Sequence, residues 1–228
     1  MSITKLEDVR KEDVATVGGK AANLGELIGM GMPVPDGFVI SDPVDIFQNI
    51  RKSYRELGAE FIAVRSSGIA EDGAKASMAG QHDTYLHCGE SDLVKRIDDC
   101  WLSTNNPRAI AYREENGITE DRIAVIVQRM IDPLYSGVLF TADPVTGDRN
   151  AMCVEWVEGT GEKLVSGEVI PESFEMSAHM EYKQDWQSTL HAYASNIEGH
   201  FGCPQDIEWC VDKDYKLWIL QARPITTL

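Results

Sequence analysis

The chain has 228 residues, 43% hydrophobic and 25% charged, a composition typical of a globular protein with one large domain or two smaller ones. Its formal net charge of -16 argues against a general nucleic-acid-binding protein, because such proteins need a basic surface to displace counterions. The apolar stretches have the length of single strands, far below the roughly 20 residues that span a bilayer, so we expect no membrane segment.

The N-terminal residues lack the apolar core of a secretory signal, which indicates a cytoplasmic protein. The five cysteines form no C-x-x-C pair and are odd in number. We therefore interpret them as buried reduced thiols, in preference to a disulfide framework or a zinc site.

Hydrophobic periodicity and turn residues predict the following elements of the N-terminal half. They are a Gly turn and short helix within 14–27, a turn at 33–37, a strand at 38–40, a helix at 47–57, a strand at 61–65, a polar loop at 66–81, a strand at 84–87, and helices at 91–101 and 107–116.

The C-terminal half is richer in strands, so we place a domain boundary near residue 122, which gives 1–122 and 123–228. The predicted elements are strands at 123–130, 136–141 and 152–157, a helix at 189–200, and a hairpin of strands 206–211 and 216–223. The mixture of strands and helices indicates an α/β or α+β class.

The first candidate site is the sequence Val17-Gly-Gly-Lys20. Paired glycines allow backbone N–H groups to point into one concavity, and a following helix N-terminus adds positive potential for a phosphate. Lys20 then supplies a point charge. The spacing is not that of a Walker A motif, and an ordinary turn with a surface lysine remains the alternative.

The second candidate is Arg65, at the end of an apolar strand, where side chains that contact ligands commonly emerge. The loop after it contains hydroxyls and small residues, including Gly80 and Gln81, and is suited to closing over phosphate oxygens. A guanidinium fits that target well. The alternative is a salt-bridged arginine at a strand end.

The third candidate is the terminal hairpin. With an odd-sum antiparallel register, Asp206 and Glu208 share a face with Gln221 and Arg223. Carboxylate and amide oxygens are ligands that Mg²⁺ takes from proteins, and the arginine suits a phosphate. A solvated face with a surface ion pair is the alternative, and the opposite face, with Ile207, Trp209, Trp218 and Leu220, is expected to be core.

Two further segments are weaker candidates. Residues 128–130, which are Gln128, Arg129 and Met130, end a strand and offer backbone groups to an adenine edge. Glu158, which begins a Gly-containing segment, offers a carboxylate to ribose hydroxyls. On spacing alone, an ordinary strand end is the favoured explanation of each segment.

Together these motifs resemble the nucleotide-binding domain of the phosphoenolpyruvate synthase and pyruvate phosphate dikinase family. The resemblance covers nearly the whole chain, in the family's order. It rests on the segments VGGKAANLGEL (17–27), PVPDGF (33–38), AVRSS (63–67), AED (70–72), AGQ (79–81), VQRM (127–130), SGVLFTADPVTGD (136–148), DIEW (206–209) and QARPI (221–225).

The resemblance implies an α+β, ATP-grasp-like fold with ATP between two subdomains, and with ATP and Mg²⁺ as cofactors. It implies that Lys20, Arg65 and Arg223 hold the phosphates and that Glu208 and Gln221 ligate Mg²⁺. It also implies that 128–130 read adenine. In the family, ATP phosphorylates a histidine on a separate domain, which carries the phosphoryl group to an acceptor-binding domain.

Two features depart from the family. None of the five histidines lies in a Thr-Ser-His-type phosphohistidine motif, and no acceptor domain is present. The stretches 41–62 and 177–205 are shorter than the helix-rich segments that the family usually carries there.

We therefore expect an ATP-binding subunit or domain of a phosphotransferase that needs a phosphohistidine-carrier partner with an acceptor-binding domain, and no nucleic-acid or membrane partner. A non-catalytic nucleotide-sensing or scaffold subunit is the alternative. A third class, an ATP-grasp ligase that forms an acyl phosphate, is disfavoured by the terminal hairpin.

Overall fold

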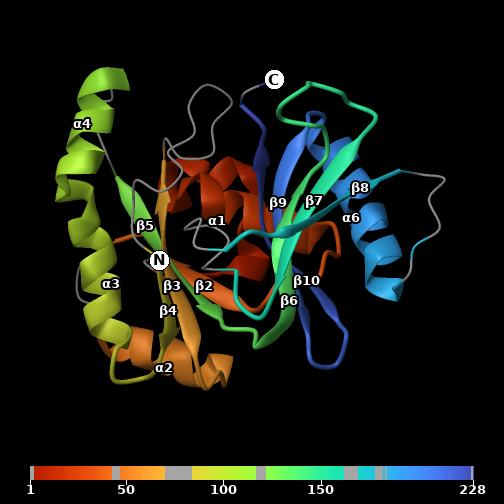
Figure 1. The fold of residues 1–228 in the computed structure, drawn as a ribbon. Helices are drawn as coiled ribbons and strands as arrows, with labels where there is room; N and C mark the ends of the chain where they lie inside the picture. Colours follow the sequence, from red (N-terminus) through yellow and green to blue (C-terminus); the bar gives the residue numbers. More distant parts are fainter. Residues whose placement is uncertain are drawn as a thin grey trace. The chain divides into compact units, whose positions relative to one another are not determined.

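The computed structural model describes residues 3–42, 47–69, 84–116, 122–161, 169–177, 182, 184–226 and 228. The chain forms two compact units, Met1–Gly29 with Pro35–Met130, and Met30–Val34 with Ile131–Leu228. Each contains a five-stranded antiparallel sheet and its own helices (Figure 1). The structure is α+β, as predicted.

The first unit has the strand order β1-β2-β5-β3-β4. Its strands are β1 (Ile3–Lys5), β2 (Gly37–Ile40), β3 (Ile62–Gly68), β4 (Thr84–Cys88) and β5 (Ile123–Arg129). Its helices are α1 (Val14–Gly29), α2 (Phe47–Leu57), α3 (Leu93–Leu102) and α4 (Pro107–Asn116), with short 3-10 turns at Leu6–Asp8, Lys11–Asp13 and Ser103–Asn105.

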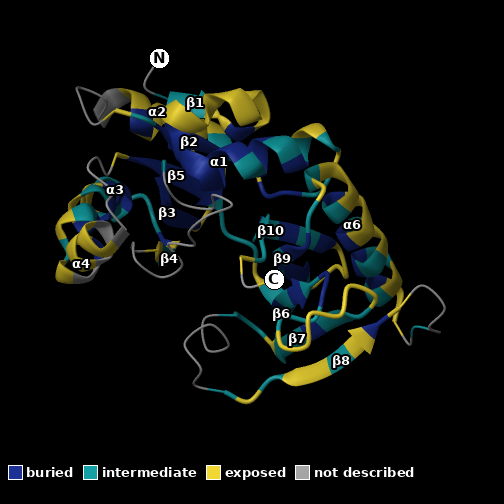
Figure 2. Ribbon diagram, turned by 90° about the horizontal axis from the view of Figure 1, so that it is seen from above, coloured by how far each residue is buried: buried dark blue, intermediate teal, exposed yellow. Residues whose placement is uncertain are grey.

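The two faces of the first sheet are covered by different helices. Ile62 and Val64 of β3 belong to a buried cluster with Ile50 of α2 and Ile97 of α3. Since side chains alternate along a strand, Arg65 and Ser67 point to the other face. There the backbone N–H of Ala21 in α1 donates to the Ser67 hydroxyl. The face of the sheet that carries Arg65 is therefore the one on which α1 packs. Figure 2 shows how far the residues of these elements are buried.

The second unit has the strand order β10-β9-β6-β7-β8. Its strands are β6 (Pro133–Phe140), β7 (Met152–Glu158), β8 (Glu172–Met176), β9 (Gln205–Asp212) and β10 (Leu217–Pro224), and its long helix is α6 (Asp185–Phe201). The short segment Met30–Val34 joins this unit through the bond from the Ile219 N–H to the Pro33 carbonyl.

Helix α6 covers one face of the second sheet through aromatic side chains. Trp186 of α6 stacks on the fully buried Trp209 of β9, with ring centroids 5.0 Å apart. Tyr135, Trp156 and Phe174 pack edge-on or tilted around Trp186. The face that carries Glu208 is consequently the one opposite α6.

The boundary predicted near residue 122 differs from this division. Strand β5 pairs with both β2 and β3, so 123–129 belong to the first sheet and the units separate between Met130 and Ile131. The sequence showed that 123–130 is a strand, but its partners lie far away along the chain. The helix predicted at 189–200 starts earlier, at Asp185.

The five cysteines are free thiols, and Cys88, Cys100 and Cys210 are buried as predicted, whereas Cys153 and Cys203 are only partly covered. Burial raises the pKa of Cys210 to about 12. Within the described part of the chain, no helix is long and apolar enough to cross a bilayer.

Gly137 of β6 tests the packing of the second unit. A Cβ there would lie 2.2 Å from the Glu155 carbonyl oxygen and 2.9 Å from the Trp209 ring. We expect Gly137→Ala to lower the free energy of unfolding by about 1–3 kcal/mol, because backbone and a buried ring cannot move aside cheaply. Urea unfolding followed by tryptophan fluorescence measures this.

Gly199→Ala in α6 is the matched control, because nothing lies within 4 Å of the added Cβ. Alanine is favoured over glycine in a helix by up to about 1 kcal/mol, so this variant should be more stable than the parent chain. Equal effects of the two substitutions would show that the close approach at Gly137 is not a constraint.

Candidate nucleotide-binding site

Lys20 and Arg65 converge in the first unit. Lys20 is only 7% exposed, and its Nζ donates to the Ser66 carbonyl at 3.1 Å, one residue beyond Arg65. Arg65 is 9% exposed. Buried cations are rare unless they are paired or serve a ligand. The two predicted phosphate contacts are 45 positions apart in sequence, and the Lys20 ammonium of α1 bonds the residue of β3 that follows Arg65.

Gly18 accounts for the local path of the chain before Lys20. Its φ of 79° and ψ of 165° interrupt α1, so the regular helix begins at Gly19. A Cβ at Gly18 would lie 2.2 Å from the Ser67 carbonyl oxygen. Both the left-handed φ and the close approach exclude a side chain there. The predicted Gly turn that leads into a helix is confirmed.

The terminal hairpin adopts the predicted register at the end that carries the candidate site residues. Gln221 pairs directly with Glu208, and Arg223 pairs directly with Asp206. A register shift between Ile219 and Gln221 leaves an irregularity at Leu220. Directly paired residues in an antiparallel sheet have Cβ atoms about 4.5–5.5 Å apart. The carboxylate and the amide are therefore side by side on one face.

The same shift corrects the prediction for the core face. Trp209 and Ile207 are buried, but Trp218 and Leu220 are only partly covered. Ile219, which pairs with Trp209, takes the buried position instead. The Trp218 indole donates to Asp212 at 2.8 Å and lies under the Lys216 ammonium.

Glu208 and Gln221 fit a magnesium ion. Mg²⁺ is commonly held by one or two protein carboxylates together with phosphate oxygens and water, and an amide oxygen is an acceptable ligand. Among the described residues no group of three His, Cys, Asp or Glu side chains forms a metal cage. Glu208 and Gln221 offer two oxygen donors, and phosphate oxygens and water would have to supply the other ligands of the ion.

Arg223 is oriented by Asp206. Its Nε and Nη2 donate to the same carboxylate oxygen, Oδ2, at 2.9 and 2.7 Å. Burial raises the pKa of Asp206 above its ordinary value, although the adjacent guanidinium of Arg223 opposes the shift. The Oδ1 atom of Asp206 is buried and has no hydrogen-bond partner among the described residues. The carboxylate thus holds one edge of the guanidinium in place.

Glu155 of β7 is a carboxylate near the candidate ligands that was not predicted from the sequence. Glu155 pairs with Val138, and Val138 pairs with Glu208, so the two carboxylates lie in one row across the sheet. The alternation within 152–157 is visible in the sequence, but the intervening strand and its register are not. Asp206 was placed on this face but was not assigned a site role.

The segment at 128–130 is already well bonded. The Gln128 amide donates to the Pro35 carbonyl at 3.0 Å, and Arg129 donates to carbonyls of Leu57 and Gly58. The N–H groups of Arg129 and Met130 donate to the Asp36 and Phe61 carbonyls. Base contacts through these N–H groups would require the present bonds to break, and adenine reading here stays a prediction.

The remaining predicted site residues are Glu158 and the loop residues Gly80 and Gln81. Glu158 is exposed at the end of β7 and pairs with Tyr135. Gly80 and Gln81 lie outside the described residues.

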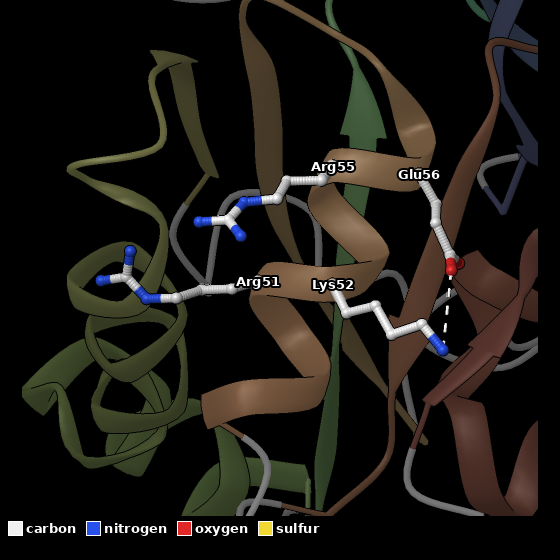
Figure 3. Close-up of a pocket in the computed structure, with 4 residues that line it drawn as sticks. All are labelled: Arg51, Lys52, Arg55 and Glu56. Atoms are coloured by element: carbon white, nitrogen blue, oxygen red, sulfur yellow. Dashed lines mark ion pairs between the residues drawn. The ribbon is translucent and has the colours of Figure 1, made fainter.

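A surface hollow at α2 is lined by Arg51, Lys52, Arg55 and Glu56 (Figure 3). Its charges are largely neutralised. Lys52 pairs with Glu56 at 3.8 Å, and the two arginines share Glu90 at 3.7 and 3.1 Å. Helix α2 also covers the sheet face opposite Arg65. This hollow therefore lies on the other side of the first sheet from Arg65.

The fold is that of the ATP-grasp proteins. The structure is similar to D-alanine-D-alanine ligase from Coxiella burnetii, with a TM-score of 0.53, 11% identity, and 95% of this chain and 49% of that chain covered. It is also similar to the N5-carboxyaminoimidazole ribonucleotide synthetase purK in its ADP complex, with a TM-score of 0.54, 9% identity, and coverage of 92% and 45%.

The chain belongs to the family described as pyruvate phosphate dikinase, AMP/ATP-binding domain, which matches residues 41–186 and 175–228. A relative named probable phosphoenolpyruvate synthase, from Archaeoglobus fulgidus, is 33% identical, with 100% of this chain and 42% of the relative covered. Rifampicin phosphotransferase from Bacillus cereus is 30% identical, with coverage of 99% and 36%. The chain thus spans less than half the length of these relatives.

The domain is also trimmed within the matched region. The alignment with the Archaeoglobus protein extends over 318 positions, whereas this chain has 228 residues. The two family matches overlap at residues 175–186, where the segment 177–205, predicted to be shortened, begins. Internal shortening is therefore supported, and its predicted position at 41–62 stays a prediction.

The Asp206–Arg223 pair yields a pH-dependent prediction. Arg223→Met leaves the Asp206 carboxylate partly buried without its cation, so we expect about 1–3 kcal/mol lower stability at pH 7. Without the guanidinium the pKa of Asp206 rises further. A carboxyl group with a raised pKa takes up its proton before the pH reaches 3.8, the ordinary pKa of an aspartate. The loss of stability therefore shrinks as the pH falls toward that value, because a neutral Asp206 no longer needs its cation. Urea unfolding at pH 7 and pH 4 measures it.

Lys213→Met is the control, because it removes the cation of the Lys213–Asp132 pair, whose side chains are 70% and 75% exposed. Exposed pairs contribute at most about 1 kcal/mol, so little change is expected at either pH. An Arg223→Met loss of the same size at both pH values would contradict the role assigned to Asp206.

Proposed function

We propose that this chain binds Mg·ATP and passes a phosphoryl group to a histidine on a partner domain or chain. The observation that carries the proposal is the pairing of Glu208 with Gln221 and of Asp206 with Arg223 on the face of the second sheet opposite α6. A carboxylate, an amide and an oriented guanidinium form a donor set for a metal-bound phosphate.

Each unit has its own task in this proposal. In the first, Lys20 and Arg65 neutralise phosphate oxygens, and their burial strengthens that interaction by excluding water. In the second, Arg223 meets a further phosphate oxygen while Glu208 and Gln221 hold the metal ion. When bound, Mg²⁺ neutralises phosphate charge and fixes the geometry of the phosphate chain.

Positioning and charge neutralisation are sufficient for the chemistry, as is general for phosphoryl transfer. A ring nitrogen of the acceptor histidine attacks the phosphorus atom and forms the N–P bond. The P–O bond to the leaving phosphate breaks, and its electron pair passes to the leaving oxygen. Lys20, Arg65 and Arg223 stabilise the charge that develops there. This chain itself forms no covalent intermediate.

The histidine belongs to a partner in this proposal, which is consistent with relatives more than twice as long as the chain. Those relatives are named as phosphoenolpyruvate synthases and rifampicin phosphotransferases. The final acceptor is accordingly pyruvate, a phenol-like hydroxyl or an antibiotic hydroxyl. The proposed cellular location is the cytoplasm, where ATP and reduced thiols are found.

The test is a transfer assay. The chain is incubated with labelled ATP, Mg²⁺ and the product of a neighbouring reading frame that carries a phosphohistidine motif. Acid-labile, base-stable label on that partner is expected, and analysis for AMP, ADP and phosphate identifies which phosphoryl group moves. Binding of ATP without transfer to any carrier would instead favour a nucleotide-sensing or scaffold subunit.

Arg65→Ala and Glu208→Ala test the assigned residues. We expect each to reduce the transfer rate at least about a hundredfold, because each removes charge stabilisation from the transition state. Glu208→Ala should also raise the Mg²⁺ concentration needed for half-maximal rate. Single-turnover transfer at several Mg²⁺ concentrations measures both effects.

Two exposed positions serve as controls for these substitutions. Arg55→Ala removes an arginine of the first unit that is 69% exposed, and Glu172→Ala removes an exposed carboxylate of β8. Both variants should transfer label at the parent rate. If Arg65→Ala and Glu208→Ala behaved like these controls, the site assignment would be wrong.

A further inference from the structure

The start of the regular part of helix α1 is held by a residue of strand β3. The first N–H groups of a helix have no acceptor within the helix, and a side chain of the residue before it commonly accepts one of them. Here that residue is Gly18, which has no side chain and lies outside helical geometry. The hydroxyl of Ser67 takes its place, accepting the Ala21 N–H at 3.0 Å.

This contact is tight and fully buried. Ser67 is 0% exposed. A Cβ at Gly18 would lie 2.2 Å from the Ser67 carbonyl oxygen and 2.5 Å from its hydroxyl. The next carbonyl along β3, that of Ser66, accepts the Lys20 ammonium at 3.1 Å. Gly18, Lys20 and Ala21 are thus all fixed against two consecutive residues of one strand.

The same strand carries Arg65. Arg65 and Ser67 are two positions apart in β3, so their side chains share the face on which α1 packs. The bond between Ser67 and Ala21 therefore sets the position of Lys20 relative to Arg65. A shift of the helix start would move the ammonium away from the guanidinium with which it is proposed to share a phosphate.

We propose that Ser67 is a positioning residue for nucleotide binding: its hydroxyl fixes the start of the α1 helix and thereby holds Lys20 beside Arg65. The inference rests on the proposed role of Lys20 in binding ATP. It adds a residue whose side chain contacts the backbone of α1 and acts on the phosphate through Lys20.

The first measurement does not depend on ATP. Hydrogen exchange of the Ala21 amide is followed by NMR in the parent chain, in Ser67→Ala and in Ser67→Thr. Ser67→Ala should accelerate exchange of this amide about tenfold, whereas Ser67→Thr, which keeps the acceptor oxygen, should restore protection. Unchanged exchange in Ser67→Ala would overturn the proposal.

The second measurement is a double-mutant cycle with Mg·ATP affinity as the readout. We expect Ser67→Ala to weaken binding about three- to tenfold, the size of effect that loss of a helix cap produces. In a Lys20→Met background the same substitution should change the affinity little, because the group that it positions is gone. Equal weakening in both backgrounds would show that Ser67 does not act through Lys20.

Ser103→Ala is the matched control. Ser103 is equally buried in the first unit, and its hydroxyl bonds the Cys100 carbonyl at the end of α3. This variant should lose stability without losing ATP affinity, which separates positioning from a general structural effect. If the parent chain bound no ATP, the proposed function would fail, while amide exchange would still decide whether Ser67 holds α1.

Discussion

The register between β9 and β10 is the constraint on which the candidate site residues of the second unit depend. Side chains on paired strands share a face only when the register has the right parity, and a slip of one residue would send Gln221 and Arg223 to the opposite face. The irregularity at Leu220 allows two registers in one hairpin. Near the turn, Ile219 faces Trp209 in the core, and beyond the bulge Gln221 faces Glu208. Bulges of this kind redirect side chains, often near functional sites.

The core of the second unit is what enforces this register. Trp209 is fully buried against Trp186 of α6, and Gly137 on the neighbouring strand leaves room for its ring. Because the indole cannot change faces without losing this contact, β9 is fixed, and Glu208 and Asp206 are fixed with it. The packing of the apolar face thus determines where Asp206 and Glu208 lie on the polar face.

Much of this could be predicted from the sequence, because it depends on local rules. Strand alternation gave the parity of the hairpin, and paired glycines gave the break before Lys20. The boundary near 122 failed because the partners of β5 are non-local, and Trp218 and Leu220 were assigned to the core because a bulge leaves no mark in alternation. Glu155 was missed for a related reason. Its alignment with Glu208 across the sheet can be recognised only once β6 is known to lie between β7 and β9.

The acidity of the chain and the proposed anionic ligand are compatible because the relevant field is local. The net charge is -16, yet Lys20 and Arg65 are withdrawn from solvent, where their interactions are screened less than those of surface charges. Exposed cations such as Arg51 and Arg55 are instead shared with Glu90 at the surface. What distinguishes the proposed phosphate contacts is therefore their burial on a fixed framework, of which the close contact between Gly18 and Ser67 is a part.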